Sequence, residues 1–302
     1  KIKEKGWEEY EKLANEGIEL LVGDELPPFV LYFNGEKPLW LFVKGNKDLL
    51  YSKDLLYIGV VGTRNPSPSA KNYIRKLMWL LCRYPVAVVS GLAEGIDSWA
   101  HTISMEWGIK NIALLGHGIY VSTSKESKKL MNKLVESGGV VATEYFPKER
   151  YNRERFLRRN RLIGSLSEIL IPVQANVPSG TFSTILHALK KNKLVVGIKM
   201  NNSKIVDFLT EKGYIVLDME QDRDVIHLDE LLRNKLKQKG IKFDILTTFK
   251  RKIERLVDAE LSYRFVDKEF YLEMKSFLQQ LIEHVEHKLE SKNVDRGSDS
   301  AP

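Results

Sequence analysis

The sequence predicts an α/β fold, with a doubly wound and mostly parallel sheet followed by a C-terminal α-helical block. Apolar runs of strand length alternate with amphipathic segments of helical length over residues 57–220, which is the pattern of parallel βαβ units. Two of these runs, 57–62 and 86–90, end in turns rich in Gly, Ser and Thr that lead into a helix. In a parallel sheet such turns lie side by side at the carboxyl edge, where their N–H groups suit a phosphate.

Residues 1–56 are expected to form a lead-in that packs on the main domain. Apolar residues recur at near-helical spacing over residues 1–22, which indicates a helix. Two short apolar runs follow at 29–33 and 39–43, and the Asn-Gly pair between them is typical of a β-hairpin. We therefore expect one helix and one hairpin ahead of the main sheet.

Residues 57–220 are predicted to form the main domain. The expected strands are the apolar runs at residues 57–62, 86–90, 111–116, 139–143, 168–173, 194–198 and 214–217. The expected helices lie between them, at residues 67–83, 95–107, 124–137, 153–164, 180–191 and 204–212.

Residues 221–292 are predicted to form a helical C-terminal domain. No strand signal follows residue 220, and residues 224–239, 245–261 and 266–290 carry apolar residues at helical spacing. Positive and negative residues almost balance in this block, so it is not a basic arm. Residues 293–302 are polar and are expected to be disordered.

Composition narrows the classes of function. The 302 residues, 43% of them hydrophobic, suffice for one large or two ordinary domains with a sizeable core. A net charge of +7 and a pI of about 9.1 favour a polyanionic partner. The single cysteine, Cys82, excludes a disulfide framework, and no apolar stretch approaches the roughly 20 residues of a membrane span. We expect a reduced, soluble, cytoplasmic protein without membrane contact, and a trimmed N-terminus because the chain starts at Lys1.

Four turns rich in Gly, Ser and Thr follow predicted strands. One such turn usually means only a sharp bend, but four in one sheet favour a phosphate-binding edge. Turns without a ligand remain the alternative. The candidate phosphate-binding residues in these turns are Gly62, Thr63, Arg64, Ser90, Gly91, Gly116, Ser179, Gly180 and Thr181.

Six arginines lie between residues 150 and 161, opposed only by two glutamates. Clustered arginines beside phosphate-binding turns suit a nucleic-acid backbone, and Phe156 and Tyr151 can stack on unpaired bases. The alternative is a solvated arginine face with Phe156 in the core. The candidate DNA-binding residues from this segment are Phe156, Arg158, Arg159 and Arg161.

No catalytic or metal site is predicted. Asp97 and His101 lie four apart on a predicted helix, but no nucleophile or second histidine at metal spacing accompanies them, so a structural hydrogen bond is favoured. Glu144 follows a predicted strand and could orient an arginine or ribose hydroxyls. A plain ion pair without a functional role is the equally good alternative. No cofactor is expected.

The motifs resemble, in order and spacing, those of the DNA-processing protein A (DprA, or Smf) family over roughly residues 17–217. The matching segments are Gly62-Thr63-Arg64, Ser90 through Asp97 with Ala100-His101, Ala113 through Gly118, Thr143-Glu144, Phe156 with Arg159 through Ile163, and Ser179-Gly180-Thr181 with Thr184. The resemblance implies an extended Rossmann fold. It also implies a non-catalytic protein that binds single-stranded DNA, forms a homodimer and loads a RecA-type recombinase during natural transformation. The family's DNA pocket corresponds here to Gly62, Thr63, Arg64, Phe156, Arg158, Arg159, Asn160 and Arg161.

Two alternatives stay open. In the first, the protein is a nucleotide-binding sensor or a nucleotide hydrolase of a mobile-element or defence system. Related hydrolases place a catalytic Glu just after their glycine turn, and none follows Ser179-Gly180-Thr181 here. In the second, the helical block serves mainly as a protein-interaction module. The family usually has a winged-helix module in this place.

Overall fold

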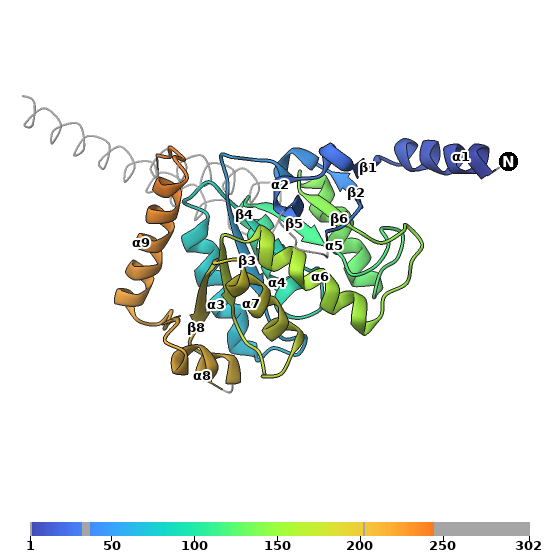
Figure 1. The fold of residues 1–302 in the computed structure, drawn as a ribbon. Coiled ribbons are helices and arrows are strands. Elements are labelled where there is room, and N and C mark those ends of the chain that lie inside the picture. The colour runs from blue at the N-terminus through green and yellow to red at the C-terminus, as the bar shows by residue number, and fades with distance from the viewer. Residues whose placement is uncertain (1, 32–36, 202, 245–302) are drawn as a thin grey trace, which may run out of the picture. The chain divides into compact units, whose positions relative to one another are not determined.

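A nine-stranded sheet runs through the described part of the chain, in the order β1-β2-β6-β5-β4-β3-β7-β8-β9 (Figure 1). The structure is a computed structural model that describes residues 2–31, 37–201 and 203–244. The strands are β1 Ile18–Val22, β2 Trp40–Gly45, β3 Leu56–Val61, β4 Val86–Ser90, β5 Lys110–Leu114, β6 Val140–Thr143, β7 Ile169–Pro172, β8 Leu194–Ile198 and β9 Ile215–Leu217. The first unit of the chain, Lys1–Phe243, contains all of them.

Seven of these strands, β3 to β9, confirm the seven predicted from the sequence. These seven strands pair with one another in parallel only. The two strands of the lead-in are antiparallel, since β1 pairs with β2 and β2 pairs with β6. Parallel strands are covered on both faces, which is why they read as continuous apolar runs: all six residues of β3 are buried. The predicted α/β class and mostly parallel sheet are therefore confirmed.

The helices cover both faces of this sheet. Leu162 and Ile163 of α6 and Ile185 of α7 pack on one face, and Met131 and Leu134 of α5 pack on the other. The helices are α1 Ile2–Asn15, α2 Pro28–Leu31, α3 Pro68–Leu81, α4 Ile96–Glu106, α5 Lys125–Glu136, α6 Arg153–Leu166, α7 Gly180–Lys190, α8 Lys204–Glu211 and α9 Asp222–Gln238, with short 3₁₀ helices at Gly23–Glu25 and Lys47–Leu50. All six helices predicted between strands are present.

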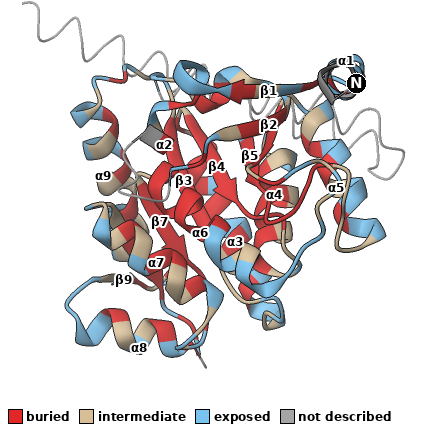
Figure 2. Ribbon diagram, turned by 45° about the vertical axis from the view of Figure 1, so that its right-hand side comes forward, coloured by how far each residue is buried: buried red, intermediate tan, exposed pale blue. Residues whose placement is uncertain are grey.

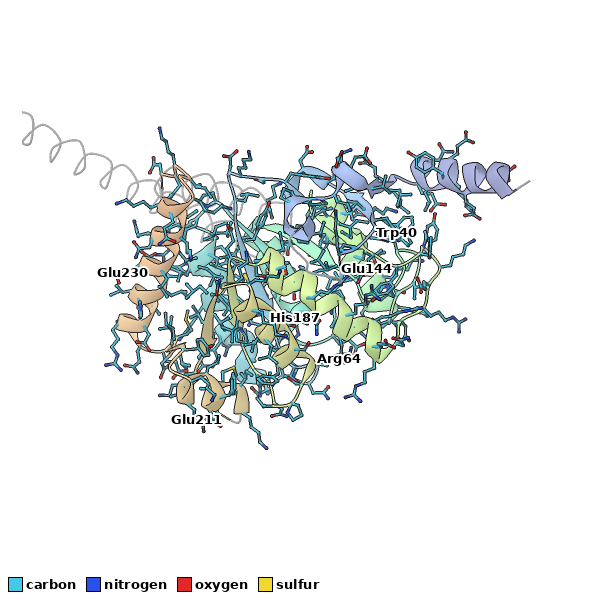
Figure 3. All side chains as sticks on the ribbon, viewed as in Figure 1. Trp40, Arg64, Glu144, His187, Glu211 and Glu230 are labelled. Atoms are coloured by element: carbon cyan, nitrogen blue, oxygen red, sulfur yellow. The ribbon has the colours of Figure 1, made fainter. Side chains whose placement is uncertain are left out.

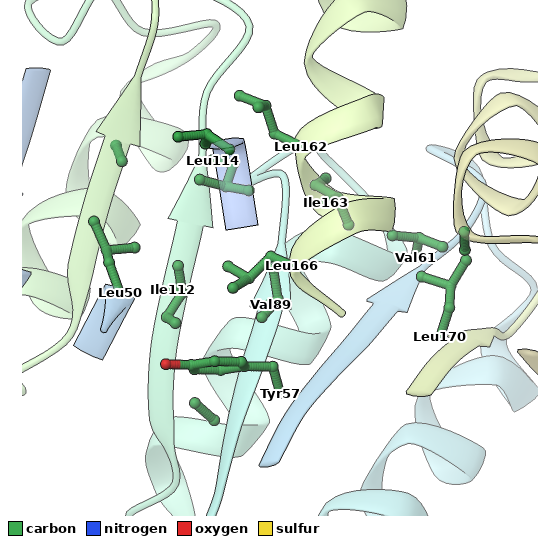
Figure 4. Close-up of a cluster of buried hydrophobic side chains, with 14 of the residues drawn as sticks. Leu50, Tyr57, Val61, Val89, Ile112, Leu114, Leu162, Ile163, Leu166 and Leu170 are labelled. Atoms are coloured by element: carbon green, nitrogen blue, oxygen red, sulfur yellow. The ribbon is translucent and has the colours of Figure 1, made fainter. Parts of the chain in front are cut away.

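The main core lies between the sheet and α6. Figure 4 shows Val89 and Ile112 of the sheet close to Leu162, Ile163 and Leu166 of α6, and all five side chains are buried. Full burial of one such side chain contributes about 1.5–3 kcal/mol. Figure 2 shows the same division, with buried residues through the sheet and exposed ones on the outer sides of the helices. This packing fixes α6 against the strand ends that form the site.

The predictions for the lead-in were partly wrong. Residues 18–22 are strand β1, because Gly17, at φ +70°, ends the helical segment there. Residues 29–31 of the run at 29–33 lie in the short helix α2 and not in a strand, and the rest of the predicted hairpin turn lies outside the described residues. Strand β2 pairs instead with β1, in the register Ile18 to Lys44, so this part of the lead-in extends the sheet.

The predicted helix at 224–239 is observed as α9. It buries Leu228, Leu232 and Leu236, and Tyr84 of the loop before β4 donates a hydrogen bond to its Asp229. The first compact unit therefore runs past residue 220 to Phe243. The helices predicted at 245–261 and 266–290, and the tail at 293–302, lie outside the described residues.

Candidate nucleic-acid interface

A cavity lies at the carboxyl ends of the parallel strands, beside β3 and β7. Strands β4 to β6 follow on one side of β3, and β7 to β9 on the other, so the chain order reverses between β3 and β7. Doubly wound sheets bind ligands in the crevice at such a reversal. Here the cavity measures about 1050 Å³ and is lined mainly by residues 62–64, 91–94, 151–153, 156–157, 159–160 and 178–181.

Backbone hydrogen bonds tie the turn after β3 to its neighbours. The Thr63 N–H donates to Gln174 O at 2.7 Å, and the Ile96 N–H donates to Thr63 O at 3.2 Å. A Cβ on Gly62 would lie 2.4 Å from the Ile96 side chain, so only glycine fits there. Several turn N–H groups that the sequence suggested for phosphate are thus used inside the protein, and the turn is held rigidly at the cavity.

Arg159 forms the buried floor of the cavity. Only 4% of this residue is exposed, and its Nη1 donates to Gly91 O at 2.8 Å and to Leu114 O. Gly91 must lack a side chain because a Cβ would lie 2.2 Å from that nitrogen. Within the described part of the chain Nη2 has no hydrogen bond, and it is open to the cavity. One edge of a fixed guanidinium is therefore free for an anion.

Asp97 shares the cavity wall with Arg159 and interacts with its charge. Its carboxylate is buried in the cavity wall and accepts the Gly91 N–H at 3.1 Å. Burial raises the pKa of Asp97 while the Arg159 cation opposes that rise, and burial lowers the pKa of Arg159 to about 10. Arg159 therefore remains a cation at neutral pH. His101 bonds elsewhere, with its Nδ1 2.8 Å from Asn111 Oδ1, so Asp97 and His101 are structural but not partners.

Aromatic side chains form another wall of the cavity. The ring centroid of Phe156 lies 6.0 Å from that of Tyr151 and 6.4 Å from that of His117, and the exposed Arg64 places its Cζ 4.8 Å from the Phe156 centroid. His117 Nδ1 donates to Gly118 O at 3.0 Å, and burial lowers the pKa of His117, so the ring is neutral at pH 7. This surface suits a base plane.

The N-terminus of α7 forms a further part of the cavity wall. Ser179 caps the helix by accepting the Phe182 N–H at 3.1 Å, and Asn160 Nδ2 donates to Gly180 O at 2.9 Å. In the described residues the N–H groups of Gly180 and Thr181 have no backbone partner. Free N–H groups at a helix N-terminus favour a phosphate.

Most of the candidate residues line this cavity. Those that do are Gly62, Thr63, Arg64, Gly91, Phe156, Arg159, Asn160, Ser179, Gly180 and Thr181. Ser90 is buried beneath the cavity and donates to Val60 O at 2.6 Å, and Gly116 makes room for Phe156, whose ring a Cβ would meet at 2.7 Å. These two residues support the walls.

Arg161 faces away from the cavity. Its side chain is 1% exposed and forms two hydrogen bonds to Glu144, with Nη1 2.8 Å from Oε1 and Nη2 2.6 Å from Oε2. Arg158 is largely exposed on α6, with Nε 3.8 Å from the same carboxylate. Figure 3 shows Glu144 beside Trp40 and apart from Arg64. The assignment of Arg161 to the DNA pocket is corrected, because a carboxylate at the end of β6 takes its charge.

The sequence argument missed some residues of the cavity wall, notably His117, Thr123, Arg153 and Asn176. The Gly-His-Gly turn after β5 was a usable signal for His117, because it follows a strand as the other site turns do. In the part of the chain that the structure describes, no three His, Cys, Asp or Glu side chains are grouped to hold a metal. No helix there is long and apolar enough to cross a bilayer.

Residues 20–236 match the family described as DNA recombination-mediator protein A. The chain belongs to this family. It is 33% identical over 171 residues to the DNA processing protein DprA of Bacillus subtilis, covering 57% of each chain. It is also 33% identical over 177 residues to the protein Smf of Escherichia coli, covering 58% of this chain and 46% of that one. The chain thus spans about half the length of these curated relatives.

Two solved structures share the fold. DprA from Streptococcus pneumoniae superimposes with a TM-score of 0.62 at 27% identity, covering 72% of this chain and 77% of that chain. DprA from Helicobacter pylori, described for its single-stranded DNA binding mode, has a TM-score of 0.62 at 24% identity and covers 73% of this chain and 96% of that one. The predicted family and Rossmann-like fold are therefore confirmed.

Proposed function

We propose that this protein binds single-stranded DNA in the cavity at the strand ends, protects the strand and hands it to a RecA-type recombinase. In this proposal it acts as a homodimer in the cytoplasm during DNA uptake and recombination. Membership of the recombination-mediator family supports the role. The observation that carries the site is the meeting of a fixed cation, Arg159, with an aromatic wall around Phe156 in one cavity.

The proposed contacts divide into phosphate and base contacts. Arg64, the open edge of Arg159 and the N-terminus of α7 receive phosphates, since these groups present charge or free N–H groups at the cavity. Phe156 and Tyr151 stack on bases. Stacking needs unpaired bases, so the cavity favours a single strand over a duplex. Neither set of contacts reads base identity, so sequence preference is weak.

The test is a binding comparison of single-stranded DNA, duplex of the same sequence and free nucleotides at two salt concentrations. We expect tightest binding to the single strand. Its affinity should fall with salt, with a log–log slope of about −0.7 for each neutralised phosphate. Equal binding of duplex, or an affinity that salt does not change, would refute the proposal.

We propose binding without catalysis, against the alternative of nucleotide hydrolysis. Hydrolysis needs a carboxylate or another acid or base within reach of the bond. Glu144 is held by Arg161 outside the cavity, and Asp97 already accepts the Gly91 N–H. Glu94 is an exposed carboxylate of the cavity wall, so the test includes it. Incubation with nucleoside mono- and triphosphates plus Mg²⁺ should release neither base nor phosphate. A release that disappears in Asp97→Asn and Glu94→Gln variants, while DNA binding persists, would favour the hydrolase.

A further inference from the structure

Helix α5 carries a lysine face that begins at the cavity. Its sequence holds four lysines against two glutamates, and the lysines, Lys125, Lys128, Lys129 and Lys133, are all exposed. Among the described residues none of the four has an ion-pair partner. Figure 2 shows exposed residues along α5. An unneutralised patch of this kind attracts a polyanion.

The lysines form a row because of their spacing. Lys125, Lys129 and Lys133 lie four apart, so each is about 6 Å along the helix axis from the next. The buried residues of α5, Ser127, Met131 and Leu134, occupy the opposite side. The row therefore faces away from the core.

The row continues directly from the cavity. Thr123 lines the cavity, and its Oγ1 is buried without a hydrogen-bond partner in the described part of the chain. Lys125 follows only two residues later, within about 7 Å of chain. A strand that leaves the cavity past Thr123 thus meets Lys125 first.

The row is electrostatically unfavourable for the helix itself. Two of its lysines, Lys125 and Lys129, lie in the first five residues of α5, where the helix dipole is positive and cations are disfavoured. The dipole and the lysines together raise the positive potential beside the cavity. That potential complements a phosphate backbone.

We propose that single-stranded DNA leaving the cavity runs along this lysine face of α5. The proposal rests on the proposed function and extends it, because it assigns a second, purely electrostatic segment to the DNA site. The cavity holds the first nucleotides by stacking and fixed donors, and the α5 lysines hold the following phosphates. Affinity should therefore grow with strand length until the row is covered.

The test compares a short oligonucleotide of about six nucleotides with one of about twenty. The variant is Lys125→Gln/Lys129→Gln/Lys133→Gln. A matched control, Lys53→Gln/Lys212→Gln/Lys237→Gln, removes the same charge from exposed lysines away from the cavity. Melting curves check that both variants fold. We expect the α5 variant to fold, because it removes cations that are unfavourable at the N-terminus of the helix.

We expect the α5 variant to bind the short strand as the wild type does but to lose more than about tenfold in affinity for the long one. Its salt slope on the long strand should fall by about 2, since each phosphate contact contributes about 0.7. Loss on the long strand no larger than in the control, equal loss on both strands, or a wild type without length dependence would overturn the lysine path alone. A wild type that binds neither strand would overturn the proposed function and this inference together.

Discussion

Two arginines of the cavity differ in what holds them. Arg64 is exposed and lies over the ring of Phe156, whereas Arg159 is buried and bonded to the carbonyls of Gly91 and Leu114. Removing the first should affect the ligand only. Removing the second should also affect the fold, because the carbonyls of Gly91 and Leu114 lose its hydrogen bonds.

Arg64→Ala should weaken single-stranded DNA binding roughly ten- to a hundredfold. A lost charge-assisted hydrogen bond is worth about 1.5–3 kcal/mol, and the exposed side chain contributes little to stability. Arg75→Ala, which removes an exposed arginine of α3, is the control. Fluorescence titration measures the affinities. If both variants bind alike, Arg64 is no phosphate ligand.

Arg159→Ala should lower the free energy of unfolding by about 3–5 kcal/mol in addition to abolishing DNA binding. The variant loses two charge-assisted hydrogen bonds to the carbonyls of Gly91 and Leu114, each worth about 1.5–3 kcal/mol. Urea unfolding measures the loss. A variant as stable as wild type would contradict the structural role of these hydrogen bonds.

His101 should make stability depend on pH. It is fully buried, and burial lowers its pKa from 6.5 to about 4. Because the folded pKa lies below the unfolded value, the neutral ring contributes fully above pH 6.5, and stability falls as pH drops from about 6.5 to 4. The fall attributable to His101 is roughly 3 kcal/mol. Urea unfolding at several pH values should show a smaller fall for His101→Gln, and equal falls would contradict the assignment.

At the scale of elements, the Glu144–Arg161 pair ties β6 to α6. Both side chains are almost completely buried, and the pair lies outside the cavity. It therefore positions the helix that carries Phe156 and Arg159. This role follows from burial, and it differs from the DNA contact that the motif suggested for Arg161.

Glu144→Ala should destabilise the fold by about 3–5 kcal/mol, because it removes the carboxylate that two nitrogens of the buried Arg161 cation bind. The double variant Glu144→Ala/Arg161→Met should be clearly milder. Glu211→Ala, which removes an exposed carboxylate of α8, serves as the control and should change stability by less than about 0.5 kcal/mol. Chemical denaturation distinguishes them. If Glu144→Ala destabilises the fold no more than the control does, the pair does not stabilise the fold.

The sheet and its turns can be predicted from sequence because each signal is local. Buried parallel strands read as apolar runs, and the turns after β3, β4 and β7 carry their glycines in sequence. The partner of a side chain is not local. Helical spacing groups Arg155, Arg158 and Arg159 on one face, but only the position of β6 decides that Glu144 meets Arg161. The pairing of β1 with β2 depends in the same way on tertiary contacts.

At the scale of the whole molecule, the net charge of +7 favours binding of DNA but does not show where on the surface the DNA binds. The fold places it, because the reversal of strand order leaves one crevice edged by the turns of β3, β4 and β7. Cations elsewhere on the surface add general attraction. The fold therefore predicts where the DNA binds as well as how tightly it binds.

Hydrogen exchange of the protein, free and saturated with single-stranded DNA, tests that location most directly. Exchange should slow for the backbone N–H groups of residues 62–64, 91–94, 176 and 179–181, which border the cavity. Exchange in α8 and β9 should not change, since these elements lie outside it. Slowing that spares the cavity turns and appears instead at α8 and β9 would contradict the account.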